Sequence, residues 1–105
     1  MQKVFTLLSL FLLFSFLSVA QTKVISGVIK DKKNSETLIS ASVIIKGTVK
    51  GVSTDVDGKF SIELDLTEPK TLVISYLGYQ DLEVLVDKTA SNLTIEIETV
   101  NMIGQ

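Results

Sequence analysis

The chain has 105 residues, enough for one small domain with a modest core and little room for a catalytic cleft. All 10 basic residues are lysine against 12 acidic residues, and this mildly acidic, arginine-free composition disfavours nucleic-acid binding, because phosphate and base contacts depend on basic side chains. Cysteine and histidine are both absent, which excludes disulfides and removes the usual zinc ligands and the common nucleophile and general base of hydrolases.

Residues 1–20 have the features of a cleavable export signal. An early lysine gives the positive start, an apolar core runs over residues 7–17, and residues 18–20 (Ser-Val-Ala) offer a small-residue cleavage site. The alternative is an uncleaved membrane anchor, but this apolar run is shorter than the ~20 residues of a spanning helix. We therefore predict a signal peptide over 1–20 and a mature domain over 21–105 that begins at Gln21 and has no transmembrane span.

After the leader, apolar and polar residues alternate as they do in β-strands, whose successive side chains face opposite sides. The first two strand-like segments, 25–29 and 41–45, are rich in β-branched residues, and the polar run 31–36 between them is a predicted loop. In these two segments we expect the following side chains to face the core: Ile25, Ile29, Ala41, Val43 and Ile45.

The segment 59–66 has the clearest alternation in the chain. Its inward side chains are expected to be Phe60, Ile62, Leu64 and Leu66, with Lys59, Ser61, Glu63 and Asp65 in solvent. Because Glu63 and Asp65 fall on the solvent face, we do not expect them to form a catalytic carboxylate pair.

The turn before this segment contains Asp57-Gly58. This dipeptide predicts the type I′ turn of a hairpin between residues 51–56 and the strand from Lys59, since both central residues of that turn need positive φ. Asp55 and Asp57 also resemble part of a calcium loop, but the closing glutamate and flanking helices of an EF-hand are missing. A structural turn is the preferred interpretation, and an ion site is the alternative.

The segment 71–76 is β-branched and almost continuously apolar, which favours a central strand. At the corner that follows, Gly78 allows positive φ, and Tyr76 and Tyr79 are expected to cap the core end with their hydroxyls near water. An exposed binding aromatic is the alternative for this corner. In the last two segments we expect inward side chains at Leu82, Val84, Val86, Leu93, Ile95 and Ile97, with Leu85 an apolar exception on the outer face.

About seven short strands at regular spacing, with no helical period after residue 21, predict an all-β sandwich or barrel. No arrangement of side chains predicts an enzyme, and we assign no catalytic, cofactor-binding or metal-binding residue. The residues that stand out are interpreted as a structural motif: Asp55, Asp57, Gly58, Phe60, Tyr76, Gly78 and Tyr79.

The order of these motifs carries a resemblance. The chain reads Ile-Ser-Gly-Val-Ile-Lys-Asp over 25–31, Lys-Gly-Thr over 46–48, Thr-Asp-Val-Asp-Gly-Lys-Phe over 54–60 and Ser-Tyr-Leu-Gly-Tyr over 75–79. From about residue 24 to 98 it resembles the carboxypeptidase-D regulatory-like domain, particularly the version at the N-terminus of TonB-linked outer-membrane transporters of the starch-utilisation type. The specific part is the Thr-Asp-x-Asp-Gly-x-Phe element over 54–60 followed by the Ser-Tyr-x-Gly-Tyr element over 75–79, since neither half alone is specific.

The resemblance implies a seven-stranded transthyretin-like or immunoglobulin-like sandwich without catalysis. It also implies export to the periplasm or outer membrane of a Gram-negative bacterium and a protein partner among TonB-linked transporter components, with no cofactor or small-molecule substrate. The sequence ends at Gln105 without a plug or barrel, so we expect either a free-standing module or the front piece of a truncated transporter. The alternative function is a structural or adhesive module on the cell surface.

Overall fold

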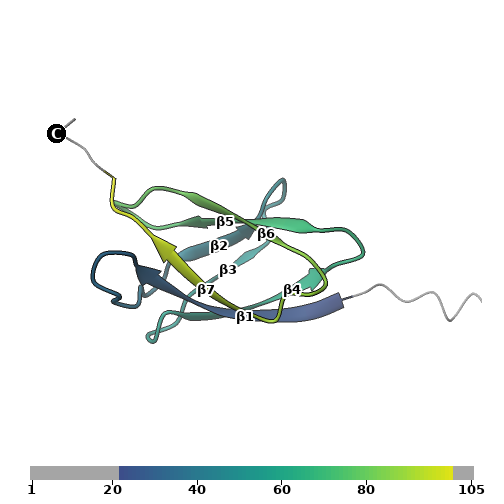
Figure 1. Cartoon of the computed structure of the whole chain (residues 1–105). Helices are drawn as coiled ribbons and strands as arrows, with labels where there is room; N and C mark the ends of the chain where they lie inside the picture. Colours follow the sequence, from purple (N-terminus) through teal and green to yellow (C-terminus); the bar gives the residue numbers. More distant parts are fainter. Residues whose placement is uncertain (1–21, 101–105) are drawn as a thin grey trace, which may run out of the picture.

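The computed structural model describes residues 22–100, and the predicted signal peptide and Gln21 lie outside these residues. The described chain forms seven strands in two sheets that pack face to face (Figure 1). The predicted all-β sandwich of seven strands is therefore confirmed. Within residues 22–100, no helix is long and apolar enough to cross a membrane.

The smaller sheet has the strand order β4-β1-β7. The central strand β1 pairs antiparallel with β4, which places Ile25 opposite Ile62, and parallel with β7, which places Ile29 opposite Ile95. The first and last strands are thus neighbours, and β1 is covered on both edges. The bounds are Thr22–Asp31 for β1, Lys59–Asp65 for β4 and Asn92–Ile97 for β7.

The larger sheet has the order β3-β2-β5-β6 and is antiparallel throughout. β5, which contains most of the segment 71–76, lies between β2 and β6, and this confirms the prediction of a central strand for that segment. The bounds are Ser42–Ile45 for β2, Gly51–Ser53 for β3, Lys70–Ser75 for β5 and Leu82–Val86 for β6.

The core lies between the two sheets and consists of aliphatic side chains with one phenylalanine. The inward faces predicted for β1, β2 and β4 are confirmed, while Ile45, Val84 and Leu93 are only partly buried at the margins. The buried apolar residues are Ile25, Ile29, Leu38, Ala41, Val43, Phe60, Ile62, Leu64, Leu66, Leu72, Ile74, Val86, Ile95 and Ile97.

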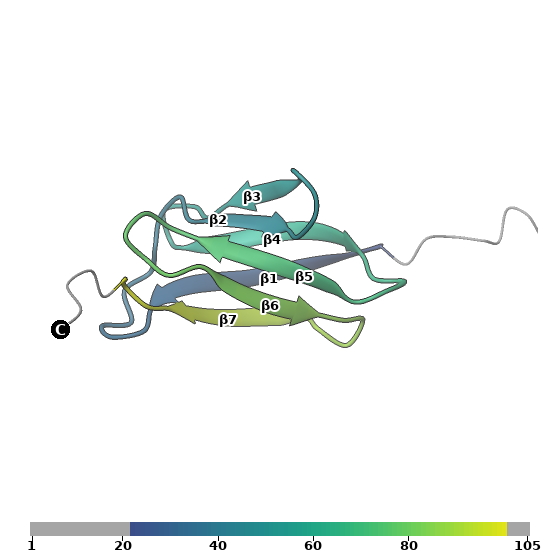
Figure 2. The same ribbon diagram turned by 90° about the horizontal axis from the view of Figure 1, so that it is seen from above.

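Leu82 departs from the predicted core. It lies on the same face of β6 as the buried Val86, yet 38% of it is exposed. Figure 2 shows the reason: β6 and β7, each an outer strand of its sheet, lie on one side of the domain, and no further strand of residues 22–100 pairs beyond them. Period-two alternation shows which face of the sheet a side chain lies on, but it does not show where that face is no longer covered by the other sheet.

Charged residues close both ends of the inner face of β1. At the start of the strand, the ammonium group of Lys23 donates to the main-chain oxygens of Lys88 (3.3 Å) and Ala90 (2.5 Å). At the other end, Asp31 is buried and is held by the turn that follows it. Each charge therefore has hydrogen-bond partners, which a buried charge requires.

Candidate functional site

Four connections meet at one end of the sandwich, and we call this end the loop pole. They comprise residues 32–41, 54–58, 76–81 and 98–100. Main-chain hydrogen bonds join them: Ile29 donates to Gly58, Leu38 donates to Ile29, and Gln80 donates to Glu98. The loop pole contains six of the seven residues that were singled out from the sequence, and the seventh, Phe60, is the second residue of β4.

The turn at residues 55–58 is built around the Asp55 carboxylate. Its Oδ1 accepts the main-chain N–H groups of Asp57 and Lys59, both at 2.9 Å. The main chain of Asp55 also accepts from the N–H of Gly58 at 2.9 Å and donates to the carbonyl of Lys59 at 2.8 Å. This is the pattern of a type I turn followed by a left-handed glycine.

The prediction of a type I′ hairpin at Asp57-Gly58 is therefore wrong. Only Gly58 has positive φ (73°), and the strands on either side, β3 and β4, belong to different sheets. The turn carries the chain from one sheet to the other. An aspartate–glycine pair is common in both turn types. Which type forms here depends on whether the strands before and after the turn pair with each other, and a local sequence pattern does not show this.

Gly58 has a steric reason to be glycine as well as a conformational one. It is buried, and a Cβ there would lie 2.7 Å from the Cβ of Thr37 and 3.0 Å from the carbonyl oxygen of Ile29. Real Cβ atoms do not approach other atoms this closely, so a side chain would push the 32–41 connection away. The turn is thus packed into the loop pole.

Thr54 seals the crossing between the sheets with a buried hydroxyl. The residue is 4% exposed; its Oγ1 donates to the carbonyl of Leu38 at 2.5 Å and accepts the N–H of Ala41 at 2.8 Å. One side chain thereby satisfies two main-chain groups of the 32–41 connection. All buried side-chain nitrogen and oxygen atoms within residues 22–100 have hydrogen-bond partners.

A second polar contact links β1 to the corner after β5. The Tyr79 hydroxyl donates to Oδ2 of Asp31 at 2.5 Å, and Oδ1 of Asp31 accepts the N–H of Lys33 at 2.7 Å. Both hydrogen bonds lower the pKa of Asp31, and the bond from Tyr79 has the larger effect. The same bond to Asp31, with partial burial, raises the pKa of Tyr79 to about 12. The pair is therefore stable as a neutral phenol and a carboxylate.

The corner itself has the predicted glycine conformation but a different role for one tyrosine. Gly78 has φ of 88°, and the rings of Tyr76 and Tyr79 pack edge to face with centroids 5.4 Å apart. Both rings are partly buried against the core. The hydroxyl of Tyr79 does not point to water as expected, because it is bonded to the buried Asp31.

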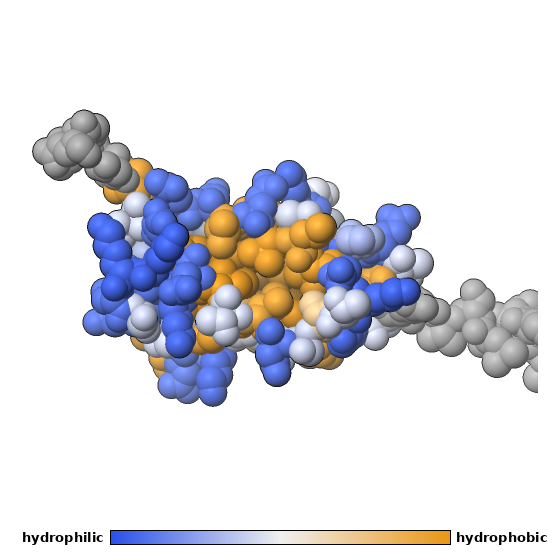
Figure 3. All heavy atoms as spheres, viewed as in Figure 1, coloured by the Kyte–Doolittle hydropathy of each residue, from blue (hydrophilic) through white to orange (hydrophobic). Residues whose placement is uncertain are grey.

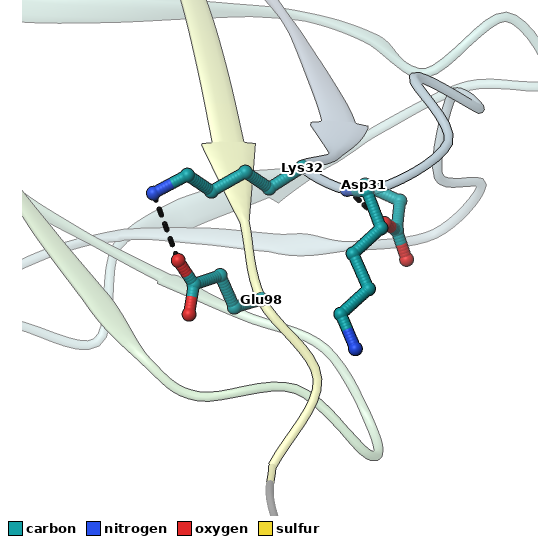
Figure 4. A network of polar contacts seen from close by, with 4 residues as sticks. Asp31, Lys32 and Glu98 are labelled. Carbon is teal, nitrogen blue, oxygen red and sulfur yellow. Dashed lines mark hydrogen bonds and ion pairs between the residues drawn. The ribbon is translucent and has the colours of Figure 1, made fainter.

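The C-terminal end of β7 is tied to the same loops. Lys32 donates its main-chain N–H to Ile97, and its ammonium group lies 2.8 Å from Glu98 (Figure 4). Both side chains of this ion pair are more than half exposed, so it adds little stability. Val100 donates to the carbonyl of Gly78, and the described residues end there.

The surface of the loop pole presents apolar side chains to solvent. Leu77 is 96% exposed and Ile39 is 49% exposed, and together with Ser40, Ser75 and Tyr76 they line a shallow hollow of about 520 Å³. Within residues 22–100, no three histidine, cysteine or acidic side chains gather in a way that could hold a metal ion. This surface therefore combines exposed apolar side chains with exposed charged ones such as Lys32 and Glu98.

Asp31 and Thr54 lie in stretches that carry the family resemblance, but neither side chain has a role of its own in the prediction from sequence. Asp31 falls in a predicted polar loop, and Thr54 is only the first residue of the motif at the turn. One signal was available: Asp31 continues the inward alternation of Ile25 and Ile29, which places a carboxylate on the core side of β1. The local pattern does not show the role of Thr54, because its hydrogen-bond partners lie 13 and 16 residues away in the sequence.

The sequence profile of the CarboxypepD_reg-like domain matches residues 25–103. The chain is 36% identical over 88 residues to the TonB-dependent receptor P26 of Formosa agariphila, which covers 84% of this chain and 8% of the receptor. It is 39% identical over 74 residues to the TonB-dependent receptor SusC of Bacteroides thetaiotaomicron, which covers 68% and 7%.

A third relative, the TonB-dependent receptor P3 of Formosa agariphila, is 30% identical over 92 residues, covering 81% of this chain and 9% of the receptor. The chain thus spans less than a tenth of the length of the curated relatives it matches. The resemblance stated from the sequence motifs is confirmed by the matched profile and by these relatives. The chain belongs to the family of CarboxypepD_reg-like domains.

Proposed function

We propose that this protein is a non-catalytic, exported binding module that positions a protein partner in TonB-dependent uptake across the outer membrane. The observation that carries the proposal is the similarity of 68–84% of the chain to segments of three TonB-dependent receptors. The loop pole supports a binding role, because it offers exposed apolar side chains on a rigid, hydrogen-bonded base. The proposed location is the periplasm or the periplasmic side of the outer membrane, after removal of residues 1–20.

The test places a photo-crosslinking amino acid at Leu77, on the loop pole, in the tagged protein expressed in a Gram-negative host that carries a TonB-dependent receptor. Val49 is the matched control, because it is 98% exposed but lies in the β2–β3 connection at the opposite end of β2. We expect crosslinks from Leu77 to the receptor or to its energising partner in the envelope fraction, with few from Val49.

Two results would contradict the proposal. The first is a protein that stays in the cytoplasm with its N-terminal residues intact, measured by fractionation and intact mass. The second is an envelope protein whose Leu77 and Val49 crosslinks are equally sparse and contain no component of TonB-dependent uptake. The second result would favour a structural module over a binding one.

A further inference from the structure

The outer edge of β6 is open. β6 has a single neighbour, β5, and no segment within residues 22–100 pairs with its other side. Residues 98–100 pair with 78–80 just before β6 begins and do not extend along it. β6 therefore presents unpaired main-chain N–H and C=O groups that a further strand can bond.

Among the four outer strands, β6 is the least protected against such pairing. β3 has only three residues, β4 alternates apolar residues with charged ones such as Lys59 and Glu63, and β7 places Glu96 on its outer face. β6 reads Leu-Glu-Val-Leu-Val and, like β7, has one glutamate and no lysine or proline. It differs from the other three outer strands in its exposed apolar side chains, Leu82 and Leu85, where proteins usually protect an edge with charged residues or proline.

Both faces beside β6 offer apolar contacts to an added strand. Leu82 is 38% exposed on the inner face, where Val84 and Leu93 are partly buried beside the gap between the sheets. Leu85 is 71% exposed on the outer face, opposite Thr71 of β5. Figure 3 shows this side of the domain, with apolar side chains gathered in the middle and hydrophilic ones at both ends.

The charge around β6 is acidic. Residues 80–87 contain three acidic residues and no basic one: Asp81, Glu83 and Asp87. The Glu83 carboxylate already has one cationic partner, because the ammonium group of Lys46 lies 3.0 Å from it. The negative charge of this edge therefore comes mainly from Asp81 and from the acidic residues at the end of β7. Between the start of β6 and the end of β7 lies a hollow of about 210 Å³, where Asp81, Glu96 and Glu98 face a single lysine, Lys32. A basic side chain on a strand beside β6 would find complementary charge there.

We propose that the open edge of β6 is the partner-binding edge of this module, and that it accepts an extended segment of another protein in which apolar and basic residues alternate. The proposal rests on the proposed binding function and names the surface and the chemistry of the partner. The added strand would place its apolar residues against Leu82 on the inner face and its basic residues on the outer face, with their charges near Asp81 and Glu83 and their aliphatic stems against Leu85. Main-chain bonds to β6 would supply affinity, and these side-chain pairs would supply selectivity.

The probe is a synthetic peptide of about nine residues in which valine and lysine alternate, long enough to pass all of β6. It is titrated into the protein, expressed as the whole chain, and backbone amide shifts and hydrogen exchange are followed by NMR. We expect shifts and slower exchange on β6. A valine–glutamate peptide tests the charge, and a valine–lysine peptide with alternate N-methylated amides tests the main-chain bonds; both should bind more weakly.

Two pairs of variants separate the edge from general surface effects. Leu85→Lys and Glu83→Lys should each weaken binding by about twofold to fivefold. The first places a like charge beside the lysines of the added strand, and the second removes the opposite charge, which Glu83 shares between Lys46 and that strand. Val49→Lys and Glu63→Lys make the same chemical changes on exposed residues away from β6 and should leave binding unchanged.

Three outcomes would overturn the proposal: no peptide binding, binding mapped to β4 or β7, or equal effects in the test and control variants. Self-association of the protein that alters β6 amides without peptide would also overturn it, since the occupant would then be a second copy. Crosslinking from Leu77 in cells is independent of these results. Receptor crosslinks without peptide binding at β6 would leave the proposed function standing and remove only this edge as its site.

Discussion

Replacing Thr54 by valine tests whether the crossing between the sheets depends on one hydroxyl. Valine keeps the shape of the side chain but removes the Oγ1 that bonds the carbonyl of Leu38 and the N–H of Ala41. Ala41 is fully buried and Leu38 is 8% exposed, so water cannot replace the lost bonds freely. Each buried main-chain group left without its partner costs about 1–3 kcal/mol.

We therefore expect Thr54→Val to lower the free energy of unfolding by about 2–4 kcal/mol. A domain of this size has a total stability of about 5–10 kcal/mol, so the loss is large. Thr54→Ser is the matched control. It keeps the hydroxyl and removes one buried methyl group, which costs about 1 kcal/mol.

The measurement is urea unfolding followed by circular dichroism, with the slope of the transition checked to be the same in all three proteins. Equal losses in Thr54→Val and Thr54→Ser would refute the reasoning. They would show that the hydroxyl of Thr54 contributes no more to the stability of the crossing than its methyl group does.

Three further predictions concern the loop pole and the strand beside it. Gly58→Ala should lower the free energy of unfolding, measured by calorimetry, by about 2–4 kcal/mol, because it adds a steric clash to an unfavourable φ. Gly47→Ala is the control: Gly47 also has positive φ, but a Cβ there has no atom within 4 Å, so the loss should be about 1 kcal/mol. Similar losses in the two variants would contradict the packing argument. Phe60→Ala should cost about 3–5 kcal/mol in urea unfolding and Ser61→Ala less than about 0.5 kcal/mol; equal effects would mean that the faces of β4 are misassigned. The pKa of Tyr79 in the folded protein is raised from 10.0 to about 12, so the hydrogen bond from Tyr79 to Asp31 contributes fully to stability below pH 10 and this contribution is lost as the pH rises through 12. When the free energy of unfolding is measured across this pH range, Tyr79→Phe should abolish the part of the alkaline loss that comes from Tyr79. An equal alkaline loss in the wild-type protein and the variant would contradict the bond to Asp31.

The strands were readable from the sequence where one face is buried and the other wet. Phe60, Ile62 and Leu64 alternate with polar residues because β4 has core on one side and solvent on the other. The continuous apolar run 71–76 likewise indicated a strand with neighbours on both edges. In each case the information lies within a few residues of the feature.

The sheet membership and the polar contacts of the loop pole could not be read in the same way. Whether residues 51–53 pair with β2 or with β4 depends on packing across the whole domain, and that choice decides the turn type at Gly58. The role of Thr54 depends on where Leu38 and Ala41 come to lie. The exposure of Leu82 depends on the absence of a neighbouring strand. Local patterns carry none of these facts.

The parallel pairing of β1 with β7 has a consequence for how the domain folds. Ser26 lies opposite Asn92, so the contact that completes the smaller sheet joins residues from opposite ends of the described chain. Closing such a long loop costs entropy before any contact repays it, and domains rich in distant contacts fold slowly. One edge of β1 stays unpaired until β7, the last strand, has formed. A polypeptide that emerges from a ribosome or a membrane pore N-terminus first can therefore complete this sheet only after residue 97 is free, and the emerging chain has to be kept from aggregation through that edge until then.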